Sequence, residues 1–272
     1  MCQIWTAHVW WRRIYSRVVG VPLRLIPMEI GQIAMHMGSI TGVDDTQIFP
    51  VASWLIEHPQ GLVLFDTGMH IDLQSSFDRI GEHTAKTITP DFSPGQELTA
   101  RLESRGIRPG DIDQIIVSHL HFDHCGGNEE VPDARVVVQR AEWESGHDQR
   151  MIDYGVYNPD DYDHGHDIHE LDGEHDVFGD GTIVCLPTPG HTKGHQSLRV
   201  ELASGPVVLT GDCVYLGSML DDMTVPTMAS ERSQNVQRES MRYLASLRDQ
   251  GCRLLFGHDS AQIANLPAEG LS

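Results

Sequence analysis

The sequence lacks any apolar run close to the roughly 20 residues that a membrane-spanning helix needs. Basic residues are also scarce, because 19 Lys and Arg stand against 39 Asp and Glu in 272 residues, giving a formal net charge of −20. Nucleic acids and anionic membrane surfaces are bound through clustered Lys and Arg, so we expect neither as a partner. We therefore expect a soluble protein.

Cysteine is too sparse and too irregularly placed to form a disulfide framework. There are 5 cysteines, an odd number, and no CxxC pair occurs. The N-terminal stretch is interrupted by Arg17, Pro22 and Arg24, whereas a secretory signal requires an unbroken apolar segment. These features favour a reducing compartment, and we expect a cytoplasmic protein.

Short apolar runs alternate along the chain with helical patterns. Runs rich in β-branched residues and Leu predict strands, and apolar residues near helical spacing predict helices. The expected strands are 48–56, 62–65, 114–118, 135–139, 182–186, 197–201, 207–210 and 253–256, and the expected helices are 96–105 and 230–250. Strands mixed with helices along the whole chain indicate an α/β sheet protein.

Two segments fall outside this pattern. Residues 1–27 are expected to be a leader or a poorly ordered N-terminal segment, with the globular part starting near Leu23 or Met28. Residues 28–272 are then one domain, because neither an internal repeat nor a linker separates them. Within it, residues 144–180 are crowded with Asp, Glu and His and are expected to form an exposed acidic insertion.

The strongest chemical signal is Ser118-His119-Leu120-His121-Phe122-Asp123-His124, directly after the apolar run 115–117. In an extended loop His119 and His121 can point toward one metal ion, and Asp123 and His124 can turn toward a second. Histidine nitrogen and carboxylate oxygen are suitable ligands for zinc and for neighbouring first-row ions. A polar loop with incidental histidines is the alternative, and this density of ligands argues against it.

The motif, with four others in matching order, resembles the metallo-β-lactamase superfamily over about residues 48–260. The other matches are Asp66 in Phe-Asp-Thr-Gly, His191 in Thr-Pro-Gly-His-Thr, Asp212 in Thr-Gly-Asp and His258 in Phe-Gly-His-Asp. The resemblance implies an αββα sandwich with two divalent metal ions at one edge of its sheets. Zinc is the default choice, although iron, manganese and cobalt suit the same ligands.

The resemblance also implies a complete set of metal ligands. One metal would be held by His119, His121 and His191, the other by Asp123, His124 and His258, and Asp212 would bridge them.

Longer matches resemble the N-acyl homoserine lactonases, the quorum-quenching enzymes of this superfamily. They are His119-Leu-His-Phe-Asp-His-Cys-Gly-Gly-Asn128, Val138-Gln-Arg-Ala-Glu-Trp143, Thr188-Pro-Gly-His-Thr-Lys-Gly-His-Gln-Ser-Leu198 and Asp212-Cys-Val-Tyr215. The resemblance places Tyr215 at the lactone carbonyl, although an aromatic residue that only anchors its loop remains the alternative.

The expected reaction is attack on the lactone carbonyl by a hydroxide held between the two metals. Tyr215 would stabilise the oxyanion, and Asp123 would deliver a proton to the leaving ring oxygen. No GxSxG elbow suggests a covalent route. Another lactonase, a thioesterase resembling glyoxalase II, a phosphotriesterase or a non-catalytic metal-binding protein remains an alternative, and the protein is expected to be a monomer or a homodimer.

Several residues have two interpretations. Asp66 either orients a ligand histidine or ends its strand in a turn. The His164, His166 and His169 tract is interpreted as a solvated loop, with adventitious metal binding as the alternative. Cys125 and Cys213, each next to a ligand, are interpreted as packing residues. Phe122 either lines the pocket or plugs the core, and Met28, Met35, Met37 and Met69 either form an apolar wall for an acyl chain or pack the core.

Overall fold

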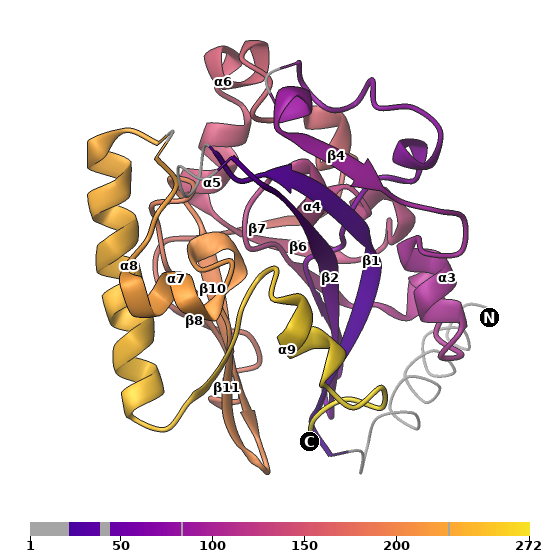
Figure 1. The fold of residues 1–272 in the computed structure, drawn as a ribbon. Coiled ribbons are helices and arrows are strands. Elements are labelled where there is room, and N and C mark those ends of the chain that lie inside the picture. Colours follow the sequence, from indigo (N-terminus) through magenta and orange to yellow (C-terminus); the bar gives the residue numbers. More distant parts are fainter. Residues whose placement is uncertain (1–21, 39–43, 83, 228) are drawn as a thin grey trace, which may run out of the picture.

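Two β-sheets lie face to face at the centre of the computed structural model, with helices on their outer faces (Figure 1). The structure describes residues 22–38, 44–82, 84–227 and 229–272. The larger sheet has the strand order β4 (Ile88–Asp91), β1 (Arg24–His36), β2 (Thr46–His58), β3 (Gly61–Phe65), β5 (Gln114–Ile116), β6 (Arg135–Gln139), β7 (Ile168–Leu171). The smaller sheet has the order β12 (Arg253–Leu255), β11 (Gly205–Leu209), β10 (Gln196–Leu202), β9 (Ile183–Pro187), β8 (His175–Asp176).

Helices cover the outer face of each sheet. The α-helices of the described residues are α3 (Leu98–Glu103), α4 (Phe122–Cys125), α5 (Arg140–Gly146), α6 (Gln149–Asp153), α7 (Gly217–Asp222), α8 (Glu231–Asp249) and α9 (Ser260–Ala264). Short 3₁₀ turns are η1 (Ile71–Gln74), η2 (Thr84–Lys86), η3 (Pro109–Asp111), η4 (Asn128–Glu130), η5 (Pro159–Asp161) and η6 (Gly211–Cys213). Figure 1 shows α3 on the outer side of the larger sheet and α8 on that of the smaller one. The expected αββα sandwich is confirmed.

The alternation of side chains along the strands builds the layers, since successive residues of a strand point to opposite faces. In β6, Val137 packs between the sheets, whereas Val136 and Val138 pack on the outer face. In the smaller sheet, Val207 and Leu209 pack inward between the sheets. On its outer face, sheet residues such as Val208 meet the apolar side of helix α8, contributed by Met241, Leu244 and Leu247. Each sheet is thus buried on both faces.

The first strand agrees with Leu23 and not with Met28 as the start of the globular part, so the expected domain boundary at residue 28 lies too late. Strand β1 begins at Arg24, and Leu25 and Ile26 are buried, so residues 24–27 belong to the domain. Strand β1 was not predicted, because Pro27 and Gly31 break its pattern. Gly31 has φ of +84° at a register shift between β1 and β2, a backbone shape that favours glycine. Residues 1–21 of the expected leader lie outside the described residues.

The acidic segment 144–180 also differs from expectation, because it is not only an exposed insertion. It contributes β7, which extends the larger sheet beside β6, and β8, which extends the smaller sheet. Tyr157, Tyr162 and Leu171 of this segment are buried. A few large apolar side chains therefore anchor a stretch whose average composition is acidic.

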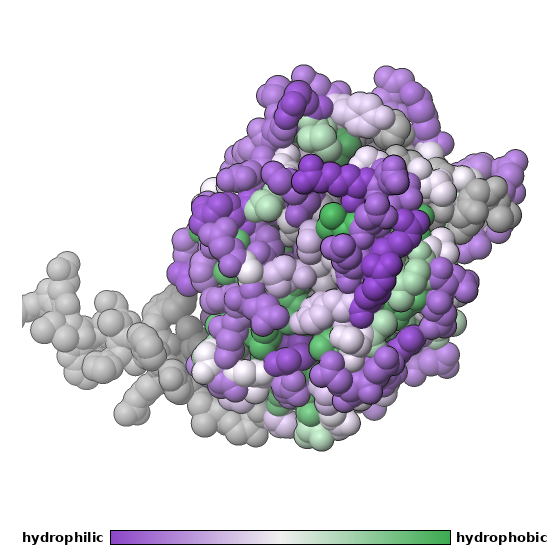
Figure 2. Space-filling view, turned by 90° about the vertical axis from the view of Figure 1, so that its left-hand side faces the viewer, coloured by the Kyte–Doolittle hydropathy of each residue, from purple (hydrophilic) through white to green (hydrophobic). Residues whose placement is uncertain are grey.

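Most other expected elements are confirmed within a few residues, including both helices and the hairpin of β2 and β3. Among the described residues, no helix is long and apolar enough to cross a membrane. Polar and charged side chains cover most of the face seen in Figure 2, with only scattered apolar patches.

Candidate metal centre

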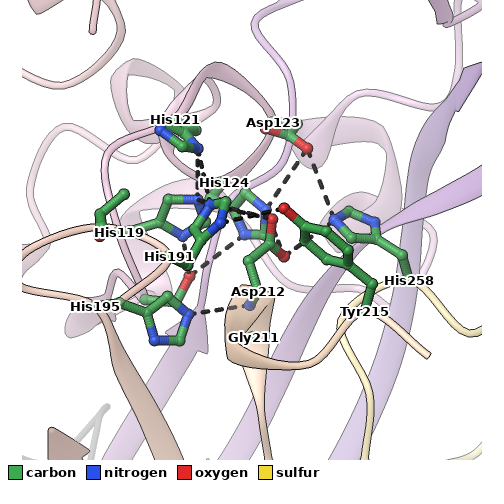
Figure 3. A network of polar contacts seen from close by, with 12 residues as sticks. His119, His121, Asp123, His124, His191, His195, Gly211, Asp212, Tyr215 and His258 are labelled. Carbon is green, nitrogen blue, oxygen red and sulfur yellow. Dashed lines mark hydrogen bonds and ion pairs between the residues drawn. The ribbon is translucent and has the colours of Figure 1, made fainter. Parts of the chain in front are cut away.

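The candidate metal ligands converge because the strands that precede them end at one edge of the two sheets. Strands β5, β9, β11 and β12 are followed by His119, His191, Asp212 and His258. Backbone bonds join the sheets at this edge, since the Gln196 N–H donates to the Ser118 carbonyl at 2.9 Å. Figure 3 shows the side chains gathered around Asp212.

The first group consists of three imidazoles whose nitrogens lie unusually close together. His119 Nε2 is 2.9 Å from His121 Nδ1, and His191 Nε2 is 3.1 Å from each of these two atoms. Nitrogens that share one tetrahedral zinc at about 2.0–2.1 Å lie about 3.3 Å apart. Three nitrogens cannot all pair by hydrogen bonds in such a triangle, because each has either one proton or one lone pair to offer. The triangle therefore fits a cation.

The second group consists of Asp123, His124 and His258. One ligand atom from each lies within 4.8 Å of the others, and all three residues are buried. Asp123 Oδ2 is 3.6 Å from His124 Nε2 and 3.9 Å from His258 Nε2. A carboxylate with two imidazoles is a donor set suited to a first-row divalent ion.

Asp212 lies between the two groups and faces each with a different oxygen. Its Oδ2 atom is 3.5 Å from His191 Nε2 and 3.9 Å from His119 Nε2. Its Oδ1 atom is 3.0 Å from His258 Nε2 and 3.3 Å from His124 Nε2. The structure therefore brings together all seven residues expected as ligands, with Asp212 in the position of a bridge.

Unpaired buried atoms test whether these residues fit metal ions. Buried polar atoms in proteins normally have a hydrogen-bond partner. Within this centre His124 Nε2, His258 Nε2 and Asp212 Oδ1 are buried and have none. These three atoms point toward one another, as the lone pairs of ligands around a cation would. The residues present fit two divalent ions.

In His119, His124 and His258 the ring nitrogen that faces away from the centre is held by a hydrogen bond. His258 Nδ1–H donates to the Pro50 carbonyl at 2.9 Å. Ser118 Oγ–H donates to Asp66 at 2.8 Å, so the same hydroxyl accepts from His119 Nδ1–H at 2.9 Å. Such partners orient ligand imidazoles in metal sites.

Asp66 is buried at the end of β3 and contacts two parts of the ligand loop. Its carboxylate accepts from His124 Nδ1–H at 2.9 Å and from the Ser118 N–H at 2.6 Å. Burial raises the pKa of Asp66, and the nearby His124 opposes the shift. Its backbone φ of +59° is also that of a turn, so both interpretations of this residue hold.

The first group holds neutral imidazoles. Burial lowers the pKa of His121, and burial together with the neighbouring imidazoles lowers the pKa of His119 well below its usual range. The pKa of His191 is likewise well below its usual range, chiefly because of burial. Neutral imidazole is the form that binds metals.

The second group is dominated by charge. Burial alone would raise the pKa of Asp212, but His124 and His258 hold it well below its usual range. Burial would lower the pKa of His124 and His258, but the carboxylate of Asp212 raises both. Metal binding must therefore displace protons from these two histidines.

Tyr215 lies beside the centre, with its hydroxyl 3.1 Å from His191 Nδ1. Its ring packs at centroid distances of 5.7 Å from His191 and 5.6 Å from His258. Burial, followed by the charges of Asp212 and Asp123, raises the pKa of Tyr215 well above its usual range. Its hydroxyl therefore stays protonated and can donate a hydrogen bond.

His195 and Glu142 are buried residues of the site that were not singled out from the sequence, although both stand in quoted motifs. His195 Nδ1–H donates to the Thr188 carbonyl at 3.1 Å, and its Nε2 accepts from the Asp212 N–H at 3.0 Å. Burial lowers the pKa of His195 to about 3, so the ring is neutral. His195 thus fixes the backbone of the bridging residue.

The remaining sequence interpretations are resolved in part. Cys125 and Cys213 are free and buried, as expected for packing residues. His166 contradicts a purely solvated loop, because it is buried and its Nε2–H donates to the Val131 carbonyl at 3.3 Å. The candidate metal groups of the described residues do not include His164, His166 or His169. The methionines considered as a wall for an acyl chain are all buried in the core on the outer face of the larger sheet; they are Met28, Met35, Met37 and Met69.

A cavity of about 340 Å³ adjoins the ligand loop at Phe122. Its other walls come from the segments 78–84 and 152–160, including Ile80, Ile152 and Tyr157. The His121 ring lies 5.7 Å from the Tyr157 ring, centroid to centroid. Phe122 therefore lines a pocket as well as packing against the core.

The family comparison agrees with this geometry. Residues 47–256 match the family model described as the metallo-beta-lactamase superfamily. The chain belongs to this superfamily.

Similar proteins narrow the assignment. The N-acyl homoserine lactonase AttM of Azorhizobium caulinodans is 30% identical over 238 residues, which cover 85% of this chain and 88% of AttM. AttM of Rhizobium radiobacter is 31% identical over 244 residues, which cover 87% of this chain and 90% of that protein. A solved structure of a Bacillus thuringiensis AiiA variant with N-decanoyl-L-homoserine at its active site has a TM-score of 0.79 and 26% identity, covering 91% of this chain and 98% of that one. Within the superfamily the chain stands among the N-acyl homoserine lactonases.

Proposed function

We propose that the protein hydrolyses the lactone ring of N-acyl homoserine lactones and so removes bacterial signal molecules. The single observation that carries this proposal is the position of Asp212, with one oxygen facing each of two complete ligand groups. This arrangement serves a dinuclear hydrolase, and the relatives that cover most of the chain act on these lactones by name.

The seven residues would hold two divalent ions, and we propose zinc for both. When bound, such ions lower the pKa of water toward neutrality and polarise an ester carbonyl. The ligands are His119, His121, His191, Asp123, His124, His258 and Asp212.

Two side chains of the site then have separate roles. Tyr215, held protonated, donates a hydrogen bond to the lactone carbonyl oxygen as negative charge develops on it. Water adds to the carbonyl carbon, giving one proton to Asp123 and the other to solvent, and the ring bond between that carbon and the ring oxygen breaks. Asp123 passes a proton to the departing alkoxide. The product is an N-acyl homoserine with a free carboxylate and a free hydroxyl.

The cavity beside Phe122 is the proposed place for the acyl chain. Its apolar wall includes Phe122, Ile80 and Ile152, whereas Arg79 and Asp160 make another part polar. A volume of about 340 Å³ is at the small end of the range for ligand pockets, which begins at about 300 Å³. The cavity is therefore large enough to hold an acyl chain.

The test follows ring opening by proton release with hexanoyl and dodecanoyl homoserine lactones. Purified protein is assayed before and after chelation and after metal is restored. We expect metal-dependent opening, and the ratio of the two rates measures the acyl-chain preference. A glutathione thioester and a phosphotriester serve as comparison substrates, and either one turned over far faster than both lactones would overturn the proposal.

We propose a cytoplasmic enzyme that is a monomer or a homodimer. Cell fractionation and light scattering of the purified protein test these two points.

A further inference from the structure

Glu142 of helix α5 is a buried carboxylate outside the ligand set that contacts both loops of the first ligand group. Its Oε1 atom accepts from the Leu120 N–H at 3.0 Å and from the Tyr157 hydroxyl at 3.1 Å. Its Oε2 atom accepts from the Thr192 hydroxyl at 2.7 Å and from the Gly194 N–H at 3.0 Å. The side chain is fully buried, with 0% exposure.

The four donors belong to three different parts of the site. Leu120 lies between the ligands His119 and His121, and Thr192 follows the ligand His191 directly. Tyr157 is part of the cavity wall. One carboxylate therefore connects the two loops that must approach each other to close the triangle of His119, His121 and His191.

The chemistry of the contact requires a carboxylate. An ionised carboxylate only accepts, and four donors fill its acceptor positions. A glutamine would keep one oxygen but turn an NH₂ group toward two donors, leaving the Gly194 N–H or the Leu120 N–H unpaired. A buried unpaired donor is costly, so at least one loop would move.

Close packing of the second loop against α5 supports the same role. A Cβ atom on Gly194 would lie 2.1 Å from the Glu142 backbone nitrogen, so only glycine fits there. The loop that carries His191 thus packs directly on the first turn of α5 and is bonded to the Glu142 carboxylate. Helix α5 itself follows β6 of the larger sheet, which gives the contact a rigid base.

We propose that Glu142 is a positioning residue that sets the distance between the His119–His121 loop and the His191 loop, and thereby the affinity of the first metal position. It touches neither the reacting atoms nor the metals. The inference rests on the metal centre of the proposed function. Its test measures metal binding without substrate, so a failed lactone assay leaves it standing.

The experiment compares Glu142→Gln with Glu144→Gln, a control on the same helix whose side chain is exposed. Zinc binding to the metal-free proteins is measured by competition with a chromophoric chelator. We expect one of the two binding steps to weaken by about 10- to 100-fold in Glu142→Gln, the range for partners that orient metal ligands. The other step and both steps of the control should keep wild-type affinity.

A second readout separates positioning from a general loss of fold. Far-UV circular dichroism should be unchanged, and lactone turnover of Glu142→Gln should recover toward the wild-type kcat at high zinc concentration. Thr192→Val removes one of the four donors with little change of shape, and it should weaken the same binding step to a smaller extent.

The proposal is overturned if Glu142→Gln binds both metals like the control, or if the two steps weaken equally. Should Glu142→Gln fail to fold, Thr192→Val decides alone, and unchanged zinc binding in that variant overturns the proposal.

Discussion

His124 donates a hydrogen bond from Nδ1 to the Asp66 carboxylate across 2.9 Å, while its Nε2 atom points into the metal centre without a partner. Asp66 thus fixes which nitrogen of His124 is available as a ligand. Asp66 also accepts a hydrogen bond from the Ser118 N–H. One carboxylate at the end of β3 therefore holds both ends of the ligand loop, Ser118 and His124.

Asp66→Asn tests this relationship. Asparagine tolerates the φ of +59° at this position, so the backbone should not change. The asparagine amide has only one oxygen. Its NH₂ group would therefore face either the Nδ1–H of His124 or the N–H of Ser118, and the hydrogen bond to that donor would be lost. We expect zinc affinity to fall by about 10- to 100-fold. Isothermal titration would measure it, with Asp91→Asn at the exposed edge strand as control; equal affinities would contradict the role.

Asp212→Asn should abolish both metal binding and activity. The asparagine has no negative charge, and its NH₂ group would replace the oxygen that faces either His191 or His258, so one metal position would lose a ligand atom. We expect a loss of more than about 100-fold in zinc affinity, beyond the effect of residues that only orient ligands. Elemental analysis of the purified variant measures the metal content. Asp222→Asn, at the exposed last residue of α7, is the control, and an Asp212→Asn protein with two metals and full turnover would refute the bridge.

Tyr215→Phe should leave metal content unchanged and lower the rate. The ring packing against His191 and His258 is kept, and only the hydroxyl is lost. We expect a fall in kcat of about 10-fold, the worth of one hydrogen bond of about 1–1.5 kcal/mol. Steady-state kinetics on one lactone, with metal content measured in parallel, checks this. An unchanged kcat would leave Tyr215 as a residue that only anchors its loop.

Four of the seven metal ligands could be predicted from spacing alone because they recur within residues 119–124 after a strand, whereas His191, Asp212 and His258 were expected only from the family resemblance. His119, His121 and Asp123 lie in one loop, and their chemistry is visible without the fold. Glu142 and His195 could not be assigned in this way, since their partners come from loops far apart in the chain. Their roles follow only from burial and from the hydrogen bonds that the folded chain makes.

The sequence predicts the parts of the fold whose apolar pattern is regular and misses those whose pattern is interrupted. Strands with regular apolar patterns, such as β6, were found with correct bounds. Strand β1 was missed because Pro27 and the bulge at Gly31 interrupt its alternation. The segment 144–180 was misjudged because its few buried residues, such as Tyr162, are outnumbered by acidic ones.

Asp161 makes the folding stability of the metal-free protein depend on pH in a direction that follows from its pKa. Burial raises its pKa to about 6, although Arg79 opposes the shift. In the unfolded chain its pKa is about 3.9. The folded state therefore binds more protons between these values, and the contribution of Asp161 to stability falls as pH rises through about 4 to 6.

The stability difference between wild type and Asp161→Asn measures this effect, because the asparagine does not titrate. We expect wild-type stability relative to the variant to fall by about 2–3 kcal/mol between about pH 4 and pH 7. Urea unfolding of both metal-free proteins across this range checks it. A difference independent of pH would show that the Asp161 carboxyl has an ordinary pKa.

We propose that two metal ions, held by two ligand groups that share Asp212, make this protein a lactonase. The most direct measurement is a titration of metal-free protein with zinc while the opening of hexanoyl homoserine lactone is followed. We expect no turnover without zinc and a rate that rises until two equivalents are bound and then stays constant. Full turnover in the metal-free protein, or a plateau at one equivalent, would contradict it.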